Sequence, residues 1–198
     1  MLLHRREDAS DILTTVTVLN WPVNAPTLTE GSVTLRGWTA QDADAVYLAC
    51  QDAEIQRFMD VPVPFRPEHA IQFVGEQSKE QWLSQNGAPF AITRSDDDQV
   101  LGSCGLVSVD AENLVSAVVY AVDPAFRGGR VAQRAVGILS DWAFREVGLV
   151  RLEFHIESGN ASSRLVAERL GCRYLGPRRN KTEIDGRQRD SVVYSLVK

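Results

Sequence analysis

Tyr120–Ala135 reads YAVDPAFRGGRVAQRA and indicates the end of a strand, a basic glycine turn and the start of a helix. The apolar, β-branched run Val115–Val122 is typical of a buried strand, and Asp123-Pro124 ends it. Beyond the turn, apolar residues recur on one face of a predicted helix, namely Val131, Ala135, Ile138, Leu139 and Trp142. This segment therefore predicts a strand, a tight turn and a helix in direct succession.

The turn Arg127-Gly128-Gly129-Arg130 has the chemistry of an anion site. The first amides of a helix have no partner within it, and they carry the positive end of the helix dipole. The two glycines leave the backbone open to a ligand and the two arginines add charge, so we expect a phosphate there. The alternative is an ordinary turn with solvated arginines, because short glycine-rich matches are common.

A second strand–helix unit follows the first. Leu152–Ile156 alternates as a strand, and Asn160 and Ser163 then precede a helical pattern that Gly171 closes. Asn160 suits a helix N-cap, and Gly171 suits the position just after a helix. Capping alone would explain both residues.

Together, the two units resemble the cofactor motifs of the GNAT acetyltransferases. The first is similar to the acetyl-CoA loop, Arg/Gln-x-x-Gly-x-Gly/Ala, at Arg127 and Ala132. It differs at the central glycine, which is Arg130 here, with Gly129 one position earlier. The segment Tyr120–Pro124 resembles the Tyr-x-x-x-Pro that leads into this loop in the ribosomal-protein N-terminal acetyltransferase branch.

The resemblance implies acetyl-CoA as co-substrate and no metal. It implies that the cofactor contacts Val122, Arg127, Gly128, Gly129, Arg130, Val131, Ala132, Asn160 and Ser163. It also implies a fold. The predicted order of strand, two helices, three strands, helix, strand, helix and two strands is that of GNAT enzymes. We therefore expect an α/β (α+β) architecture with a mixed, mostly antiparallel central sheet and helices on both faces.

Other elements are predicted from local patterns. Short polar turns at 95–98 and 110–113 join three strands into an antiparallel meander, and Asp185-Gly186 predicts a tight turn in the last hairpin. Two amphipathic helices are expected, over 42–52 with Ala45, Val46, Leu48 and Ala49 inward, and over 68–85 through Ile71, Phe73, Val74 and Trp82. Residues 1–27 are expected to be an N-terminal extension that packs as an irregular strap or is partly disordered, and 28–198 a single acetyltransferase domain.

Composition narrows the class of protein. With 198 residues, 44% hydrophobic and 24% charged, the chain is typical of one soluble globular domain. The net charge of −5 disfavours a nucleic-acid binder. Cys50, Cys104 and Cys172 are expected to be reduced core thiols, and the scattered histidines predict no metal site. No stretch is long and apolar enough to span a membrane, and the polar start is unlike a signal peptide, so we expect a cytoplasmic protein. Both a monomer and a homodimer are left open.

The chemistry implied by the resemblance is direct attack of an amine on the thioester, without an acyl-enzyme. Related enzymes often carry a glutamate three residues before the tyrosine of the central strand, but Ala117 stands there. Candidate bases are Asp110, Glu112, Glu153 and His155, each more typical of a solvated side chain. We therefore predict that the amine loses its proton through a water chain or reacts as its neutral fraction. Candidate catalytic residues are Ser116, to order a water, and Tyr174, to reprotonate the CoA thiolate, with Tyr194 as an alternative; a core role is open for each tyrosine.

The sequence thus predicts an N-acetyltransferase that moves an acetyl group from acetyl-CoA to a primary amine, either a protein N-terminus or a small molecule. The absence of a glutamate at 117 and the presence of Arg130 keep a second hypothesis open, a non-catalytic acyl-CoA-binding or regulatory module. A third, contact of the RGGR turn with RNA phosphates, is disfavoured by the acidic balance.

Overall fold

The computed structural model describes residues 19–184 and 187–198. Within them the strands are β1 (Leu28–Glu30), β2 (Val33–Arg36), β3 (Gly87–Arg94), β4 (Val100–Asp110), β5 (Val115–Val122), β6 (Arg151–Glu157), β7 (Arg173–Ile184) and β8 (Arg187–Val197). The α-helices are α1 (Ala43–Ala49), α2 (Ala53–Phe58), α3 (Pro67–Gln72), α4 (Ser78–Leu83), α5 (Val131–Trp142) and α6 (Ala161–Arg169). Two short 3₁₀ turns are η1 (Ala40–Asp42) and η3 (Pro124–Phe126), and two π-helical segments are η2 (Phe73–Gln77) and η4 (Ala143–Val147).

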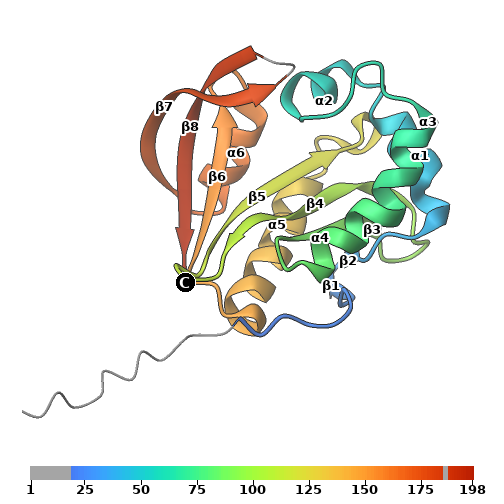
Figure 1. The fold of residues 1–198 in the computed structure, drawn as a ribbon, viewed down its shortest axis with the longest axis horizontal. Helices are drawn as coiled ribbons and strands as arrows, with labels where there is room; N and C mark the ends of the chain where they lie inside the picture. Colours follow the sequence, from blue (N-terminus) through green and yellow to red (C-terminus); the bar gives the residue numbers. More distant parts are fainter. Residues whose placement is uncertain (1–18, 185–186) are drawn as a thin grey trace, which may run out of the picture.

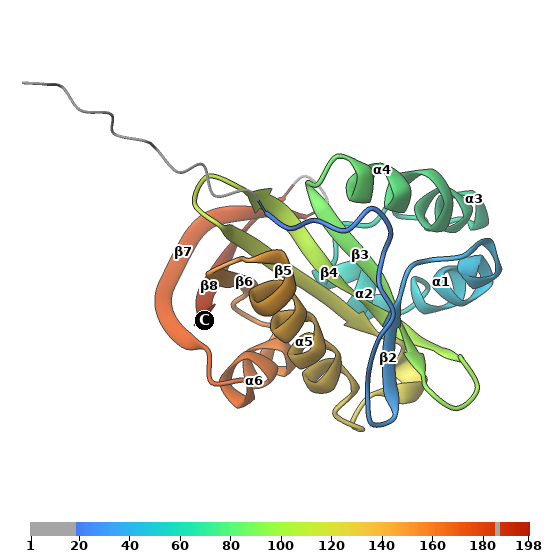
Figure 2. The ribbon, with the colours of Figure 1, turned by 90° about the horizontal axis from the view of Figure 1, so that it is seen from below.

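The strands form one sheet in the order β1-β2-β3-β4-β5-β6-β8-β7 (Figure 1). All neighbouring strands are antiparallel except β5 and β6, which are parallel. Helices α1–α4 lie on one side of the sheet, and α5 and α6 lie on the other (Figure 2). The predicted mixed sheet with helices on both faces is confirmed, and so is the meander of β3, β4 and β5.

The helix after the glycine turn, α5, packs against β2, β4 and β5. Its predicted inner face is confirmed, because Ala135, Ile138, Leu139 and Trp142 are buried and Val131 packs against the same cluster. Burial of a large apolar side chain contributes about 1.5–3 kcal/mol. This face therefore fixes α5, and with it the turn that precedes the helix, against the sheet.

A second, smaller core joins α1 to α3. Val46, Phe65, Ala70 and Val74 are buried in it. Two of the predicted inward residues do not take part, since Leu48 is 65% exposed and Ile71 is 61% exposed. The helical pattern placed them correctly on a helix but on the wrong face, because α1 and α3 pack against each other and leave Leu48 and Ile71 outside that contact.

The chain before β1 is an irregular strap in the part that the structure describes. Leu19 is buried, and the ring of Trp21 lies 5.6 Å from that of Trp82 in α4 and 6.2 Å from that of Trp142 in α5. Trp21 Nε1 donates to the Trp82 carbonyl at 3.1 Å, and Trp82 Nε1 donates to the Pro22 carbonyl at 2.9 Å. The strap therefore joins α4 to the end of α5.

Two elements differ from the expectation. The edge strand β1 was not predicted, and β7 extends to Ile184, so the last hairpin has a longer first strand than the sequence indicated. The turn predicted at 185–186 lies outside the described residues, as do residues 1–18 of the predicted extension.

Candidate active site

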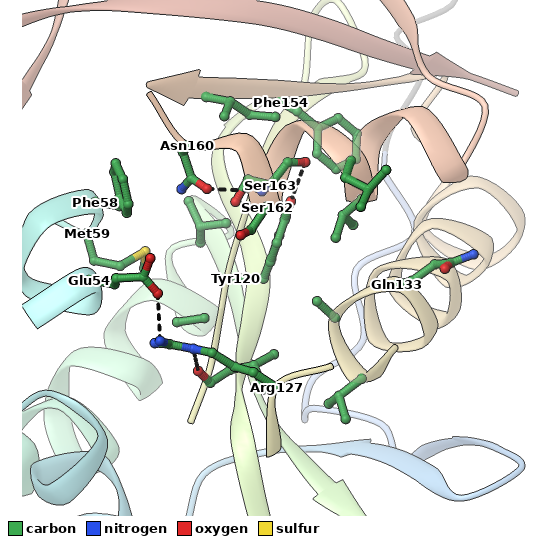
Figure 3. A pocket seen from close by; sticks show the side chains of 18 of the residues that line it. Glu54, Phe58, Met59, Tyr120, Arg127, Gln133, Phe154, Asn160, Ser162 and Ser163 are labelled. Carbon is green, nitrogen blue, oxygen red and sulfur yellow. Dashed lines mark hydrogen bonds and ion pairs between the residues drawn. The ribbon is translucent and has the colours of Figure 1, made fainter. Parts of the chain in front are cut away.

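The parallel strands β5 and β6 separate soon after they meet. Residues 115–117 pair with residues 151–153, and the ladder between β5 and β6 ends at Ala117 and Glu153. Beyond that point the strands border a cavity of about 400 Å³, which is also lined by α2, the glycine turn, the start of α5 and α6 (Figure 3). We call this the cofactor cavity. Its size is that of a small-molecule site.

The glycine turn leaves the N-terminus of α5 uncapped. Arg130 is the N-cap residue, with φ of 59°, and its side chain accepts no hydrogen bond from the helix. Gly128 has φ of 85°, a conformation that strains any L side chain. A Cβ added at Gly129 would meet no atom closer than 3.9 Å. The first amides of α5 and the positive end of its dipole are thus open to an anion beside an accessible backbone, which fits the diphosphate of CoA.

The side chain of Arg127 is paired with α2. Its terminal nitrogens bind Asp52 Oδ1 at 2.5 Å and Glu54 Oε2 at 2.7 Å, and its Nε donates to the Val122 carbonyl at 3.2 Å. Burial opposes the charge on Asp52, but hydrogen bonds from Arg127 and from the Ile55 amide outweigh it and lower the pKa of Asp52. The turn is therefore fastened to the start of α2.

Asn160 caps α6 and keeps a donor free for the cavity. Its Oδ1 accepts from the Ser163 amide at 3.0 Å, while its Nδ2 makes no hydrogen bond to any described residue. Capping and cofactor binding are therefore compatible roles for this side chain. Close by, the Tyr120 hydroxyl donates to the Ser163 carbonyl at 3.1 Å and links β5 to α6 across the opening (Figure 3). Burial raises the pKa of Tyr120 to about 12.

The structure brings together most of the residues expected to bind the cofactor. Those that line the cofactor cavity are Val122, Arg127, Gly128, Arg130, Val131, Ala132, Asn160 and Ser163. Gly129 belongs to the same turn without lining the cavity. The contact of these nine residues with the cofactor stays a prediction, which their position around one cavity supports.

The two residues proposed as catalytic lie elsewhere. Ser116 is 1% exposed, and its hydroxyl lies 2.9 Å from the Val107 carbonyl, which it can donate to inside the sheet. Tyr174 is 52% exposed, and its ring packs at 5.3 Å from that of Tyr194. Neither residue lines the cofactor cavity, so the geometry gives no support to the predicted roles. The Tyr194 hydroxyl donates to Glu168 Oε1 at 3.0 Å.

Of the four candidate bases, one lines the cofactor cavity. Asp110 binds the amides of Glu112 and Asn113 in the turn before β5, and hydrogen bonds, first of all from Asn113, lower its pKa. Neither Asp110 nor Glu112 lines the cavity. His155 does line it, and Glu153 is hydrogen-bonded to His155.

A second cavity, of about 310 Å³, adjoins the first on the side of α1–α4. We call it the acceptor cavity. Ile55 of α2, Met59 just after that helix and Ala121 of β5 line both cavities, so the two meet there. Its lining is largely apolar, with the carboxylates Asp60 and Asp123 and with no lysine or arginine.

Sequence reasoning missed the part that α2 plays. Asp52 is a residue type that caps helices, and its Oδ1 accepts from the Ile55 amide at 3.0 Å. No sequence pattern near Asp52 indicates its contact with Arg127. No role in the site was assigned from the sequence to Ile55 and Met59, which line both cavities. The described residues contain no group of three or more His, Cys, Asp or Glu side chains that could hold a metal ion. None of the helices in the same residues is long and apolar enough to cross a membrane.

Comparison with known proteins agrees with this geometry. A family model described as an acetyltransferase (GNAT) domain matches residues 32–173. The uncharacterized N-acetyltransferase p20 of Bacillus licheniformis is 28% identical over 176 residues, which cover 87% of this chain and 96% of that protein. Among solved structures, Mycobacterium smegmatis RimJ in complex with a CoA disulfide aligns with a TM-score of 0.78 at 23% identity, over 91% of this chain and 90% of that one. A ribosomal-protein-S5-alanine acetyltransferase from Vibrio fischeri aligns with a TM-score of 0.74 at 20% identity, over 87% of this chain and 96% of that one. The chain belongs to the GNAT acetyltransferase family and is an acetyl-CoA-dependent N-acetyltransferase.

Proposed function

We propose that this protein transfers an acetyl group from acetyl-CoA to a primary amine by direct attack, with the cofactor between β5 and β6. The observation that carries the proposal is the opening between these strands, which runs into the uncapped N-terminus of α5. The diphosphate lies against the amides of Val131 and Ala132, and Asn160 Nδ2 donates to the cofactor from the opposite wall. The arm that carries the thioester then follows β5 back from Val122 toward the closed end of the opening.

The amine enters through the acceptor cavity. This cavity reaches the cofactor cavity at Ala121, beside the strand that the thioester follows. Its two carboxylates, Asp60 and Asp123, attract a cationic amine, and its apolar wall suits a hydrophobic group next to that amine. The proline-rich segment 61–67 forms part of the wall, which supports a role for this loop beside the acceptor.

Direct attack is supported by the state of the cysteines. The lining of the cofactor cavity includes no cysteine. Cys50 lines the acceptor cavity, but burial raises its pKa to about 11, so it is a thiol rather than a thiolate at neutral pH. A cysteine thiolate that could take the acetyl group from CoA is thus missing from both linings.

The test is an assay of free thiol with acetyl-CoA and a panel of primary amines. Peptides with a free N-terminus, blocked lysine and small aromatic amines cover the classes that the cavity admits. We expect thiol release that depends on the amine, with a mass spectrum showing the acetyl group on the amine. Thiol release without any amine, accompanied by an acetylated protein, would contradict direct attack. Tight CoA binding with no amine-dependent thiol release would favour the non-catalytic binding module instead.

A further inference from the structure

The sheet places a carboxylate beside Ala117, on the neighbouring strand. Ala117 and Glu153 are partners in the parallel register of β5 and β6. Paired residues of adjacent strands point to the same face, and so does every second residue along a strand. Glu153, His155 and Glu157 therefore share the face of Ala117. The contact of Glu157 with Arg57 of α2, at 3.8 Å, shows that this face lies toward α2.

Glu153 and His155 form a hydrogen-bonded pair on that face. His155 Nε2 lies 3.0 Å from Glu153 Oε2, and His155 Nδ1 lies 3.2 Å from a terminal nitrogen of Arg178. A carboxylate can only accept and a guanidinium can only donate. His155 therefore donates from Nε2 to Glu153 and accepts at Nδ1, the arrangement in which a carboxylate orients a histidine base.

His155 borders the cofactor cavity near its closed end. Glu153 is the last residue of β6 in the pairing with β5, and His155 is the second residue beyond it. In the proposed function, the arm of the cofactor runs along β5 from Val122 toward this same end. The thioester then lies between β5 and His155, both of which border the cofactor cavity.

We propose that His155 is the general base of the acetyl transfer and that Glu153 is its positioning residue, an inference that rests on the proposed function. The amine nitrogen forms a bond to the thioester carbon, and the carbon–sulfur bond breaks as the tetrahedral intermediate collapses. The proton of the amine passes to His155 Nδ1, in place of the hydrogen bond from Arg178, and then to the sulfur, which leaves as a thiol. The pair takes the place of the water chain expected from the absence of a carboxylate at position 117.

The charged groups that face His155 come from several elements. Glu153 and Glu157 flank it on β6, and Arg178 approaches it from β7. Arg189 of β8 binds Glu157 Oε2 at 2.9 Å, and Arg57 of α2 lies on the other oxygen. Glu153 thus places a carboxylate on one side of the imidazole of His155, and Arg178 places a guanidinium on the other.

The experiment is kcat/KM against pH for two acceptors that ionise in different ranges. One is a short peptide without lysine, whose α-amino group has a pKa of about 7.7–8.0, and the other is blocked lysine, with a pKa of about 10.4. We expect the wild-type protein to show an inflection common to both acceptors. His155→Gln should lose this inflection and lower kcat about 100-fold or more, with CoA affinity and melting temperature unchanged.

Variants of the neighbours separate positioning from structure. Glu153→Gln should lower kcat and move the inflection to lower pH, Glu153→Asp should restore part of both, and Arg178→Gln should move the inflection to higher pH. Arg151→Gln is the matched control, because Arg151 lies 3.2 Å from the other oxygen of Glu153 and does not line the cavity. It should leave the profile in place.

Each outcome decides between two hypotheses. An inflection that follows the ionisation of each acceptor, or one that survives in His155→Gln, would overturn the role of His155 and restore the water chain, while acetyl transfer itself stands. Equal effects of Arg151→Gln and Glu153→Gln on the profile would overturn the positioning role. The absence of turnover with every amine would overturn the proposed function and His155 together.

Discussion

Arg127 of the glycine turn and Asp52 at the start of α2 bind each other at 2.5 Å, although 75 positions separate them in the sequence. Glu54 binds the second terminal nitrogen of Arg127 at 2.7 Å. Ile55 of α2 and Met59, which follows the helix, line both cavities. An arginine of the turn that we expect to bind the diphosphate is thus also held by a helix that borders both cavities.

Replacement of Glu54 by glutamine should strengthen the binding of CoA. Without the carboxylate of Glu54, the positive charge of Arg127 is less neutralised and attracts the diphosphate more strongly. Because Glu54 is exposed, the pair contributes about 0.2–1 kcal/mol, which corresponds to a gain of about 1.5- to 5-fold in Kd. The measurement is calorimetric Kd at low and high salt, and the gain should shrink in high salt. Glu68→Gln, which removes an exposed carboxylate from α3, is the control. Weaker binding of CoA in Glu54→Gln would mean that the ion pair of Glu54 with Arg127 maintains the geometry of the site.

Gly129→Val should weaken CoA binding at least about tenfold and leave the melting temperature within a few degrees. Without the cofactor there is room for a side chain at 129, since its Cβ would meet nothing closer than 3.9 Å. With the cofactor bound, the same side chain would stand where the diphosphate is expected to approach the backbone. The control is Gly128→Ala, which should destabilise the protein because φ at 128 is 85°. An unchanged calorimetric Kd in Gly129→Val would remove this turn from the cofactor site.

Asn160→Asp should raise the KM for acetyl-CoA without loss of stability. Aspartate keeps the oxygen that accepts from the Ser163 amide, so the cap of α6 is retained. It replaces the free Nδ2 donor by a negative charge, which should cost about 1.4 kcal/mol, or about tenfold in KM. Asn160→Ala, which loses cap and donor, should in addition lower the free energy of unfolding by about 1 kcal/mol. An unchanged KM together with a lowered melting temperature in Asn160→Asp would leave only the capping role.

The parts of the fold that could be predicted are those whose pattern is local. The strand before the glycine turn and the helix after it each carry a long apolar period, and the structure has them at 115–122 and 131–142. The strand β1 has three residues, which are too few to show an alternation of apolar and polar side chains. It is a strand because it pairs with β2. Leu48 shows the same limit, because a helix as short as α1 does not reveal which of its faces is buried.

The site could be predicted on the side of the cofactor and not on the side of the acceptor. The open amides at the start of α5 and the cap at Asn160 are formed by residues that are neighbours in the sequence. The link from Arg127 to Asp52 and the register that sets Glu153 beside Ala117 depend on contacts between distant segments. No single-sequence pattern encodes a register between β5 and β6, so Glu153 and His155 resembled solvated side chains of one exposed strand face.

Asp42 and Arg36 form an ion pair whose contribution to the stability of the fold depends on pH. Asp42 is 4% exposed, and its carboxylate accepts from Arg36 at 2.8 Å and 2.9 Å and from the amide of Thr39 at 2.8 Å. Burial opposes the charge, but these hydrogen bonds outweigh it and lower the pKa of Asp42 below its usual value. A carboxylate with a lowered pKa in the folded state stabilises the protein above its unfolded pKa of about 3.9, and this stability is lost as the pH falls through the folded value.

Asp42→Asn should therefore lower the free energy of unfolding by about 3 kcal/mol at pH 7, because Arg36 loses its buried partner. The difference from the wild-type protein should narrow below about pH 4, where the wild-type carboxylate also becomes protonated. Asp98→Asn is the matched variant, since Asp98 binds the Nε of the same arginine at 2.8 Å but is 64% exposed. It should cost less than about 1 kcal/mol at any pH. Urea unfolding of the three proteins from pH 3 to pH 8 measures both effects, and equal losses in the two variants would show that burial does not set the strength of this pair.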